Sequence, residues 1–361
     1  MNKLHIEGTY FNAEDFISDQ IPSYFNNCDI RLKLYLFLKE WFSSNEKISL
    51  HTSGSTGKPK EILVSKSKML ESAAMTCGFF NLNKNDKALL CLSTDFIAGK
   101  MMVIRAIYSG MDLYPVDVTG HPLAETSTAI DFAAMIPLQV YNSLSTKIER
   151  ERLSQIKNII VGGGALDKEL ENSLKDLPNS IYSTYGMTET LSHVALRRIN
   201  GVMADKYYTA LPGININLSA EQTLIIDAPF ISNELIITND IAEINSNGSF
   251  RILGRKDNVI NTGGVKVLAE EVEEKLKPYI KHNYSITSIP NTKLGEEIVL
   301  LIEKSENYNN LEYIIEKEIT LSYQQPKKIY RVKSIPLTSS GKIDRVAIKI
   351  LAQQINLVNN I

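Results

Sequence analysis

The sequence has few cysteines, no long apolar run and no excess of charge of either sign. Its three cysteines, Cys28, Cys77 and Cys91, are widely spaced. They form neither a CxxC pair nor a Cys/His cluster, so no cysteine-bound metal site is predicted. We expect three reduced thiols in a reducing compartment. With 39 basic and 41 acidic residues, the net charge is −2, which gives no reason to expect a nucleic-acid partner.

Signals for export and for membrane insertion are also missing. No stretch of about 18 consecutive apolar residues occurs, so the sequence predicts no membrane-spanning helix and no membrane partner. Residues 1–7 contain no apolar core followed by a small-residue cleavage site, so no secretory signal peptide is predicted. The expected location is the cytoplasm.

Strand-like and helix-like segments alternate through the first half of the chain, which favours a largely parallel α/β sheet. The apolar segments typical of strands are Lys47–His51, Ala88–Ser93, Ile159–Val161 and Ser180–Thr184. Those typical of helices are Ile30–Phe42, Ser67–Phe80, Gly99–Ser109 and a segment that starts near Asp167.

The pattern changes at about residue 207. Short alternating runs separated by Asn-Gly and Pro-Gly turns predict a small β-rich subdomain up to Arg255, and Asn247-Gly248 is a good hairpin signal. After Arg255 the α/β pattern returns. We therefore predict an α/β fold with a large N-terminal domain, residues 1–255, that includes the β-rich subdomain, and a small C-terminal α/β domain, residues 256–361.

The strongest local motif is the segment Thr52–Lys60, which combines hydroxyl side chains with two glycines and two lysines. Glycines let backbone N–H groups approach an anion, hydroxyls donate to phosphate oxygens, and lysines supply charge. The segment is not a Walker loop, because Thr52 stands where that motif needs glycine and Pro59 follows the lysine. It therefore indicates a phosphate-binding loop, with a mobile polar loop as the ordinary alternative.

Four further segments accompany this loop. They are Val161–Ala165, Tyr185–Thr190, Asn239-Asp240 with Gly254–Asp257, and Thr338–Arg345. Each alone has an ordinary explanation as a tight turn, a turn aspartate or a surface lysine. The order and spacing of all five favour a functional site.

In these motifs, from about Ser49 to Arg345, the chain resembles the adenylate-forming enzymes, which include acyl- and aryl-CoA synthetases, firefly luciferase and peptide-synthetase adenylation domains. The resemblance implies a large domain that binds ATP and a carboxylic acid, and a small mobile domain that closes over it. It implies ATP-dependent formation of an acyl-adenylate and then of a thioester with coenzyme A. The implied cofactors are ATP, Mg²⁺ and CoA.

The resemblance also assigns the nucleotide-binding residues. Those expected to hold the β- and γ-phosphates lie in the first motif, at Ser53, Thr56, Gly57 and Lys58. Those expected around the adenine and the ribose are Gly163, Gly164, Ala165, Tyr185, Gly186, Asp240 and Arg255.

The remaining implied roles concern catalysis. Thr188 would contact the α-phosphate, Glu189 would coordinate Mg²⁺, and Lys342 would reach the α-phosphate and the substrate carboxylate. A carboxylate attacking a phosphate brings two anions together, so cations at the reacting centre are needed. Asp257 would be the hinge between the domains. A Gly-rich segment with Gly263 and Gly264 would border the path of the CoA pantetheine, the alternative being a simple β-turn.

The phosphate loop starts unusually early, as it does in the short 2-succinylbenzoate–CoA ligases of menaquinone synthesis, which the segments Phe96–Ala106 and Tyr185–Arg197 also resemble. One carboxylate of that acid would face the α-phosphate, and the other would need donors. The candidates are Lys100, Arg105, His193 and Arg197, with surface ion pairs as the favoured alternative for the two arginines and a structural role as the alternative for His193. We predict Phe96, Lys100 and His193 in the substrate pocket.

Two other functions remain open at this stage. One is a stand-alone adenylation enzyme that loads a carrier-protein thiol, and the other is a catalytically inactive nucleotide-binding sensor. Because the shortened N-terminal part exposes surface that other family members cover, a homodimer is also an expectation.

Overall fold

The computed structural model describes residues 3–18, 20–51, 61–304, 310–338 and 343–359. Its largest element is a nine-stranded sheet in the order β11-β10-β9-β8-β7-β5-β6-β1-β2. The strands are β1 (Lys3–Ile6), β2 (Thr9–Asn12), β5 (Lys87–Leu90), β6 (Asp112–Pro115), β7 (Phe132–Met135), β8 (Asn158–Val161), β9 (Ser180–Gly186), β10 (His193–Arg198) and β11 (Thr209–Ala210). The central strands from β1 to β9 pair in parallel, whereas β2, β10 and β11 are antiparallel to their neighbours.

Helices cover both faces of this sheet. Successive side chains of a strand point to opposite faces, so each buried strand contributes to two cores. In β7, Phe132 and Ala134 belong to one core, and Ala133 and Met135 belong to the other. The first core includes side chains of α2 (Asp29–Phe42), α3 (Lys66–Phe80) and α4 (Ile97–Ser109). The second includes side chains of α5 (Pro137–Ser145), α6 (Lys147–Gln155) and α7 (Lys168–Leu174).

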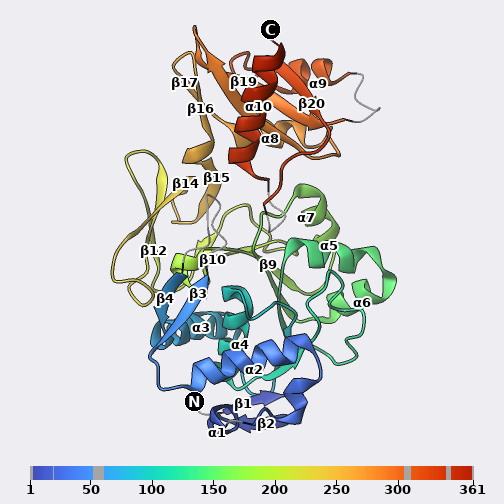
Figure 1. Cartoon of the computed structure of the whole chain (residues 1–361), viewed down its shortest axis with the longest axis vertical. Coiled ribbons are helices and arrows are strands. Elements are labelled where there is room, and N and C mark those ends of the chain that lie inside the picture. The colour runs from blue at the N-terminus through green and yellow to red at the C-terminus, as the bar shows by residue number, and fades with distance from the viewer. Residues whose placement is uncertain (1–2, 19, 52–60, 305–309, 339–342, 360–361) are drawn as a thin grey trace.

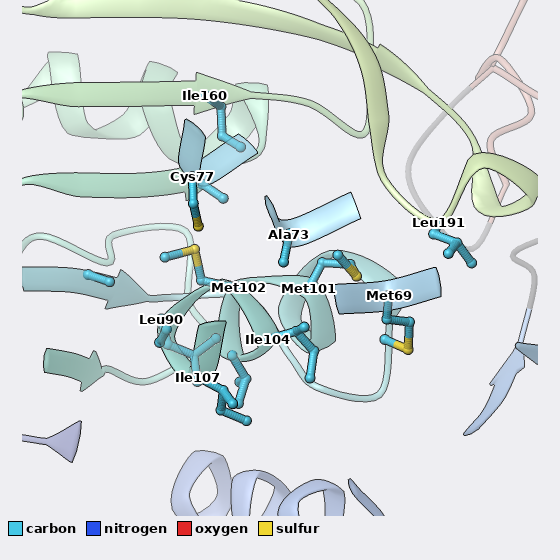
Figure 2. Close-up of a cluster of buried hydrophobic side chains, with 14 of the residues drawn as sticks. Met69, Ala73, Cys77, Leu90, Met101, Met102, Ile104, Ile107, Ile160 and Leu191 are labelled. Atoms are coloured by element: carbon cyan, nitrogen blue, oxygen red, sulfur yellow. The ribbon is translucent and has the colours of Figure 1, made fainter. Parts of the chain in front are cut away.

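Helix α4 is buried along most of its length and packs against α3. Figure 2 shows this region, where Met69, Ala73 and Cys77 of α3 lie in one cluster with Met101 and Met102 of α4. The two α4 methionines are at most 1% exposed, so they are core residues. A helix buried this deeply has little room for charge, which makes Arg105 in its last turns a residue that needs explanation.

A separate antiparallel pair, β3 (Lys47–His51) and β4 (Glu61–Ser65), flanks the expected phosphate loop. The loop itself, residues 52–60, lies outside the described residues.

The predicted β-rich subdomain is a four-stranded antiparallel sheet in the order β12-β13-β14-β15. Its strands are β12 (Asn215–Leu218), β13 (Thr223–Asp227), β14 (Ile236–Ile244) and β15 (Phe250–Arg255). Gly248 has φ of +83° in the turn between β14 and β15, where the Asn-Gly pair predicted a hairpin.

Residues after Arg255 form a further sheet with its own helices (Figure 1). It contains β16 (Val259–Thr262), β17 (Val265–Leu268), β18 (Tyr284–Asn291), β19 (Gly295–Glu303) and β20 (Lys328–Val332), with α8 (Ala269–Leu276), α9 (Leu311–Glu318) and α10 (Arg345–Asn359). Two apolar clusters pack against it, both separate from the cores of the large sheet. The predicted α/β class is therefore confirmed, and the division between residues 255 and 256 stays a prediction.

Figure 1 shows the two termini at opposite ends of the long axis, with the β-rich sheet beside the larger one. Within the described ranges, none of the helices has both the length and the apolar character needed to cross a bilayer.

Candidate active site

The glycine run after β8 packs directly on β9. A Cβ atom added to Gly162 would lie 2.3 Å from Thr184 Oγ1, so only glycine permits this approach. Gly163 has φ of +79°, which glycine adopts without a steric penalty. Gly163, Gly164 and Ala165 are exposed. The loop therefore presents accessible backbone at the carboxyl end of a parallel strand, where α/β sheets bind ligands.

Two side chains hold the carboxylate of Asp240 in β14. The Tyr185 hydroxyl donates to Asp240 Oδ2 at 2.6 Å, and Arg255 Nη1 donates to Asp240 Oδ1 at 3.1 Å. Burial and the charge of Asp240 raise the pKa of Tyr185 far above its usual value, so this hydroxyl stays protonated. The structure thus brings together three residues that the sequence assigned to the adenine and the ribose.

Asp257, the expected hinge, lies in the short 3₁₀ helix η3 (Lys256–Asn258) directly after β15. Its Oδ2 atom accepts from Arg255 Nη2 at 3.0 Å and from Asn239 Nδ2 at 3.3 Å. The Asp257 side chain is half exposed. Contacts from β14 and β15 therefore hold the carboxylate of the residue at the start of the C-terminal part.

Gly263 and Gly264 form the turn between β16 and β17, with φ values of +59° and +83°. Positive φ at both central residues is typical of a type I′ hairpin turn. A Cβ atom on Gly264 would meet nothing within 4 Å. The backbone of this turn is thus open on one side, and its role beside a pantetheine stays a prediction.

Thr188 and Glu189 lie in the 3₁₀ turn η2 (Thr188–Thr190) immediately after β9. Glu189 is exposed. In nucleotide sites Mg²⁺ takes one or two carboxylates together with substrate phosphates and water, so a single accessible carboxylate fits this ion. Within the described part of the chain, no group of three or more acidic, histidine or cysteine side chains could hold a metal.

A buried polar chain begins where this turn ends. Arg105 Nη2 donates to Ser192 Oγ at 2.5 Å, and Ser192 Oγ lies 3.4 Å from His193 Nδ1. His193 Nε2 lies 3.2 Å from Thr76 Oγ1, which donates to the carbonyl of Ser72 at 3.3 Å. These contacts connect α4, the start of β10 and α3.

The donors in this chain can be assigned from the groups that only donate or only accept. Arg105 only donates, so the Ser192 hydroxyl is free to donate to His193 Nδ1. The proton of the neutral imidazole is then on Nε2 and points to Thr76. Burial and the nearby Arg105 lower the pKa of His193 well below its usual range, which keeps the ring neutral at pH 7.

Arg105 is only 2% exposed, and no carboxylate pairs with it among the residues that the structure describes. Its Nε atom is buried without any partner. Burial lowers the pKa of the guanidinium to about 10, so the group is still a cation at neutral pH. The favoured sequence interpretation, a surface ion pair, is therefore wrong for this residue.

The other candidates for the second carboxylate are placed differently. Arg197 forms an ion pair with Glu171, but its side chain is only 13% exposed, so the pair is partly buried and not on the surface as that alternative predicted. Lys100 Nζ lies 3.6 Å from Glu40 Oε2, so its charge already has a partner. The Phe96 side chain is 58% exposed at the start of α4. Of the predicted substrate-pocket residues, only His193 contacts the polar chain of Arg105.

Five predicted site residues lie outside the described part of the chain; they are Ser53, Thr56, Gly57, Lys58 and Lys342. Beside the last of these, Arg345 forms a two-pronged ion pair with Glu273 at 2.6 and 2.7 Å. The described chain next to the lysine motif is thus fixed to α8.

Sequence reasoning missed Ser192 and Thr76. Ser192 precedes His193 in a segment already recognised, so its neighbour could have drawn attention to it. Thr76 shares a buried face of α3 with Ser72, and both are at most 1% exposed. Two hydroxyls on the apolar face of a helix were the available signal.

The parallel sheet places the exposed loop after β8 and the turn after β9 at the carboxyl ends of neighbouring strands, where α/β folds bind ligands. A family model described as AMP-binding enzyme matches residues 48–229, about half of the chain. An acyl-CoA synthetase (AMP-forming)/AMP-acid ligase II-like protein from Dyadobacter fermentans is 32% identical, with a TM-score of 0.63, over 92% of this chain and 96% of that chain. The chain belongs to the AMP-binding enzyme family.

Curated proteins with similar sequences include 2-succinylbenzoate–CoA ligases. A 2-succinylbenzoate–CoA ligase from Listeria monocytogenes is 24% identical over 86% of this chain and 71% of that protein, and one from Bacillus cereus is 22% identical over 94% and 78%. The o-succinylbenzoate CoA synthetase of Bacillus subtilis, solved with ATP and magnesium ion, has the same fold (TM-score 0.70, 17% identity, 82% of this chain and 68% of that one). The protein is an AMP-forming acid–CoA ligase, which agrees with the expected cofactors ATP, Mg²⁺ and CoA.

Proposed function

We propose that the protein activates an aromatic dicarboxylic acid of the 2-succinylbenzoate type to its acyl-adenylate and then transfers the acyl group to CoA. The names of the curated relatives support this substrate. The observation that carries the proposal is the buried guanidinium of Arg105, which has no carboxylate partner among the residues that the structure describes.

A buried cation without a counter-ion is unfavourable, because desolvation costs several kcal/mol per ion. A substrate carboxylate would supply the missing negative charge, and the unpaired Nε–H of Arg105 would supply a donor for it. The neutral His193 adds no second positive charge. An acid with only one carboxylate, which must face the α-phosphate, would leave Arg105 unpaired.

On the nucleotide side, Asp240 and Arg255 would bind the ribose hydroxyls, and Tyr185 would pack on the adenine. Thr188 would donate to the α-phosphate, and Lys342 would approach it from the C-terminal domain. Glu189 would hold Mg²⁺, whose charge stabilises the polyphosphate when the ion is bound.

In the first half-reaction a carboxylate oxygen of the acid bonds to the α-phosphorus, and the bond to pyrophosphate breaks. In the second, the CoA sulfur bonds to the acyl carbon, AMP leaves, and the thiol proton is released. We also propose that residues 256–361 rotate about Asp257 between the two steps, which would bring Gly263 and Gly264 to the pantetheine.

The test is pyrophosphate release with ATP and Mg²⁺, with and without CoA. The acids are 2-succinylbenzoate and 4-oxo-4-phenylbutanoate, which is the same molecule without the ring carboxylate. Losing one partner of a buried charge pair costs about 2–5 kcal/mol, so we expect kcat/KM to fall roughly 30- to 4,000-fold for the second acid. Equal turnover of both acids would refute the dicarboxylate assignment. Adenylation without CoA use would instead favour the carrier-loading function, and ATP binding without pyrophosphate release the sensor.

A further inference from the structure

Thr190 lies in the turn η2 between Glu189, which we propose to hold Mg²⁺, and Ser192, which accepts a hydrogen bond from Arg105. It is fully buried. Its Oγ1 atom accepts from the backbone N–H of Met187 at 2.8 Å. The same atom lies 2.7 Å from the carbonyl of Ser192 and 2.9 Å from that of Met187, so its single hydrogen can be donated to either. One hydroxyl therefore links both ends of the segment 187–192.

The residues enclosed by these contacts are Thr188 and Glu189, which we assign to the α-phosphate and Mg²⁺. The residue at the far end, Ser192, begins the polar chain to Arg105. A shift of this turn would consequently move the nucleotide contacts relative to the acid contacts.

The backbone of the turn needs such a restraint. Leu191 has φ of +61° and ψ of −36°, a conformation that is strained for a residue with a branched side chain. Burial of the Leu191 side chain stabilises this conformation, because Leu191 is 3% exposed and belongs to the same core as Met69 and Ala73 (Figure 2). A Cβ atom on Gly186 would lie 2.3 Å from the Ser192 carbonyl, so the turn folds back closely on β9.

We propose that Thr190 is a positioning residue whose hydroxyl fixes the turn and so sets the substrate carboxylate against the α-phosphate. This inference rests on the proposed function for the roles of Thr188, Glu189 and Ser192. It predicts that removing the Thr190 hydroxyl slows adenylation even when the shape of the side chain is kept.

The test compares Thr190→Val, which keeps the shape but removes the hydroxyl, with Thr190→Ser, which keeps the hydroxyl. Misplacement of reacting groups by about 1 Å can cost on the order of 100-fold in rate. We expect single-turnover adenylation to fall by about that factor in Thr190→Val, with MgATP affinity within about threefold of wild type. Thioester formation from supplied acyl-adenylate should change little, and Thr190→Ser should restore adenylation to within about fivefold. Wild-type adenylation in Thr190→Val, or equal losses in both variants, would overturn the proposal.

A second measurement does not depend on the substrate. The Met187 amide loses its acceptor only in Thr190→Val, so hydrogen exchange at this amide should become on the order of tenfold faster than in wild type and in Thr190→Ser. Unchanged protection would overturn the proposal. Failure of the proposed function appears separately, as absence of turnover by the wild-type protein on 2-succinylbenzoate.

Discussion

Replacing Arg105 by methionine tests whether its guanidinium binds the substrate or only stabilises the fold. Methionine fills similar space without charge and suits a core that already contains Met69, Met101 and Met102. In the ligand-free protein the change removes a buried guanidinium that has no carboxylate partner within the described residues. It also removes the hydrogen bond to Ser192.

The two readouts should move in opposite directions. Replacing buried charged groups by apolar ones is often neutral or stabilising by about 1–4 kcal/mol, so ligand-free Arg105→Met should unfold at an equal or higher temperature. Its kcat/KM on 2-succinylbenzoate should fall roughly 30- to 4,000-fold, the range for losing one partner of a buried charge pair. On 4-oxo-4-phenylbutanoate, which has no charge for Arg105 to bind, the loss should be under about fivefold.

The assay therefore measures kcat/KM of the wild-type protein and of Arg105→Met on 2-succinylbenzoate and on 4-oxo-4-phenylbutanoate. Thermal unfolding of both proteins is measured in the presence and absence of 2-succinylbenzoate. Arg105→Lys is the control that keeps the charge but not the planar group, and it should retain part of the selectivity. If Arg105→Met lost about 3–5 kcal/mol of stability and equal activity on both acids, the guanidinium would be structural, and the reasoning would be refuted.

Three further changes test other parts of the site. Lys342→Ala should strongly reduce adenylation, because a cation at the α-phosphate is lost, but leave thioester formation from supplied acyl-adenylate; equal losses in the two assays would contradict this role. Gly264→Leu, at φ of +83°, should do the reverse and block thioester formation while pyrophosphate release persists, unless the pantetheine path lies elsewhere. Because the pKa of His193 is lowered in the fold, the unfolded state binds its proton first as pH falls. Stability should therefore decrease below about pH 6.5, and His193→Gln should flatten that slope in urea titrations at pH 5–7; an unchanged slope would show that other groups cause it.

Local pattern was sufficient to predict the alternating fold. The apolar segment Ile159–Val161 is the core of β8, and the segment Gly99–Ser109 nearly coincides with α4. The change to short alternating runs near residue 207 correctly predicted the β-rich sheet. These signals are local because strand and helix periodicity are read over a few residues.

The strands β1 and β2 were not predicted, since four residues leave little periodicity to read. The surroundings of Arg105 were not predicted either. Its partner Ser192 is 87 positions away, and charge in a sequence by itself favours an exposed position. The contacts of the Thr190 hydroxyl depend on the backbone conformation of residues 187–192, including the positive φ of Leu191. The presence of a threonine in the sequence does not indicate that conformation.

The proposed rotation about Asp257 would make the contacts of its carboxylate bear on the speed of the catalytic cycle. Rotation about this residue would break its pair with Arg255 and its hydrogen bond with Asn239 once in every turnover. A half-exposed pair of this kind contributes about 0.2–1 kcal/mol, which would slow the rotation by no more than about fivefold. Under the proposed rotation, these weak contacts would favour one domain orientation without limiting the rate of turnover, and added salt should weaken them further.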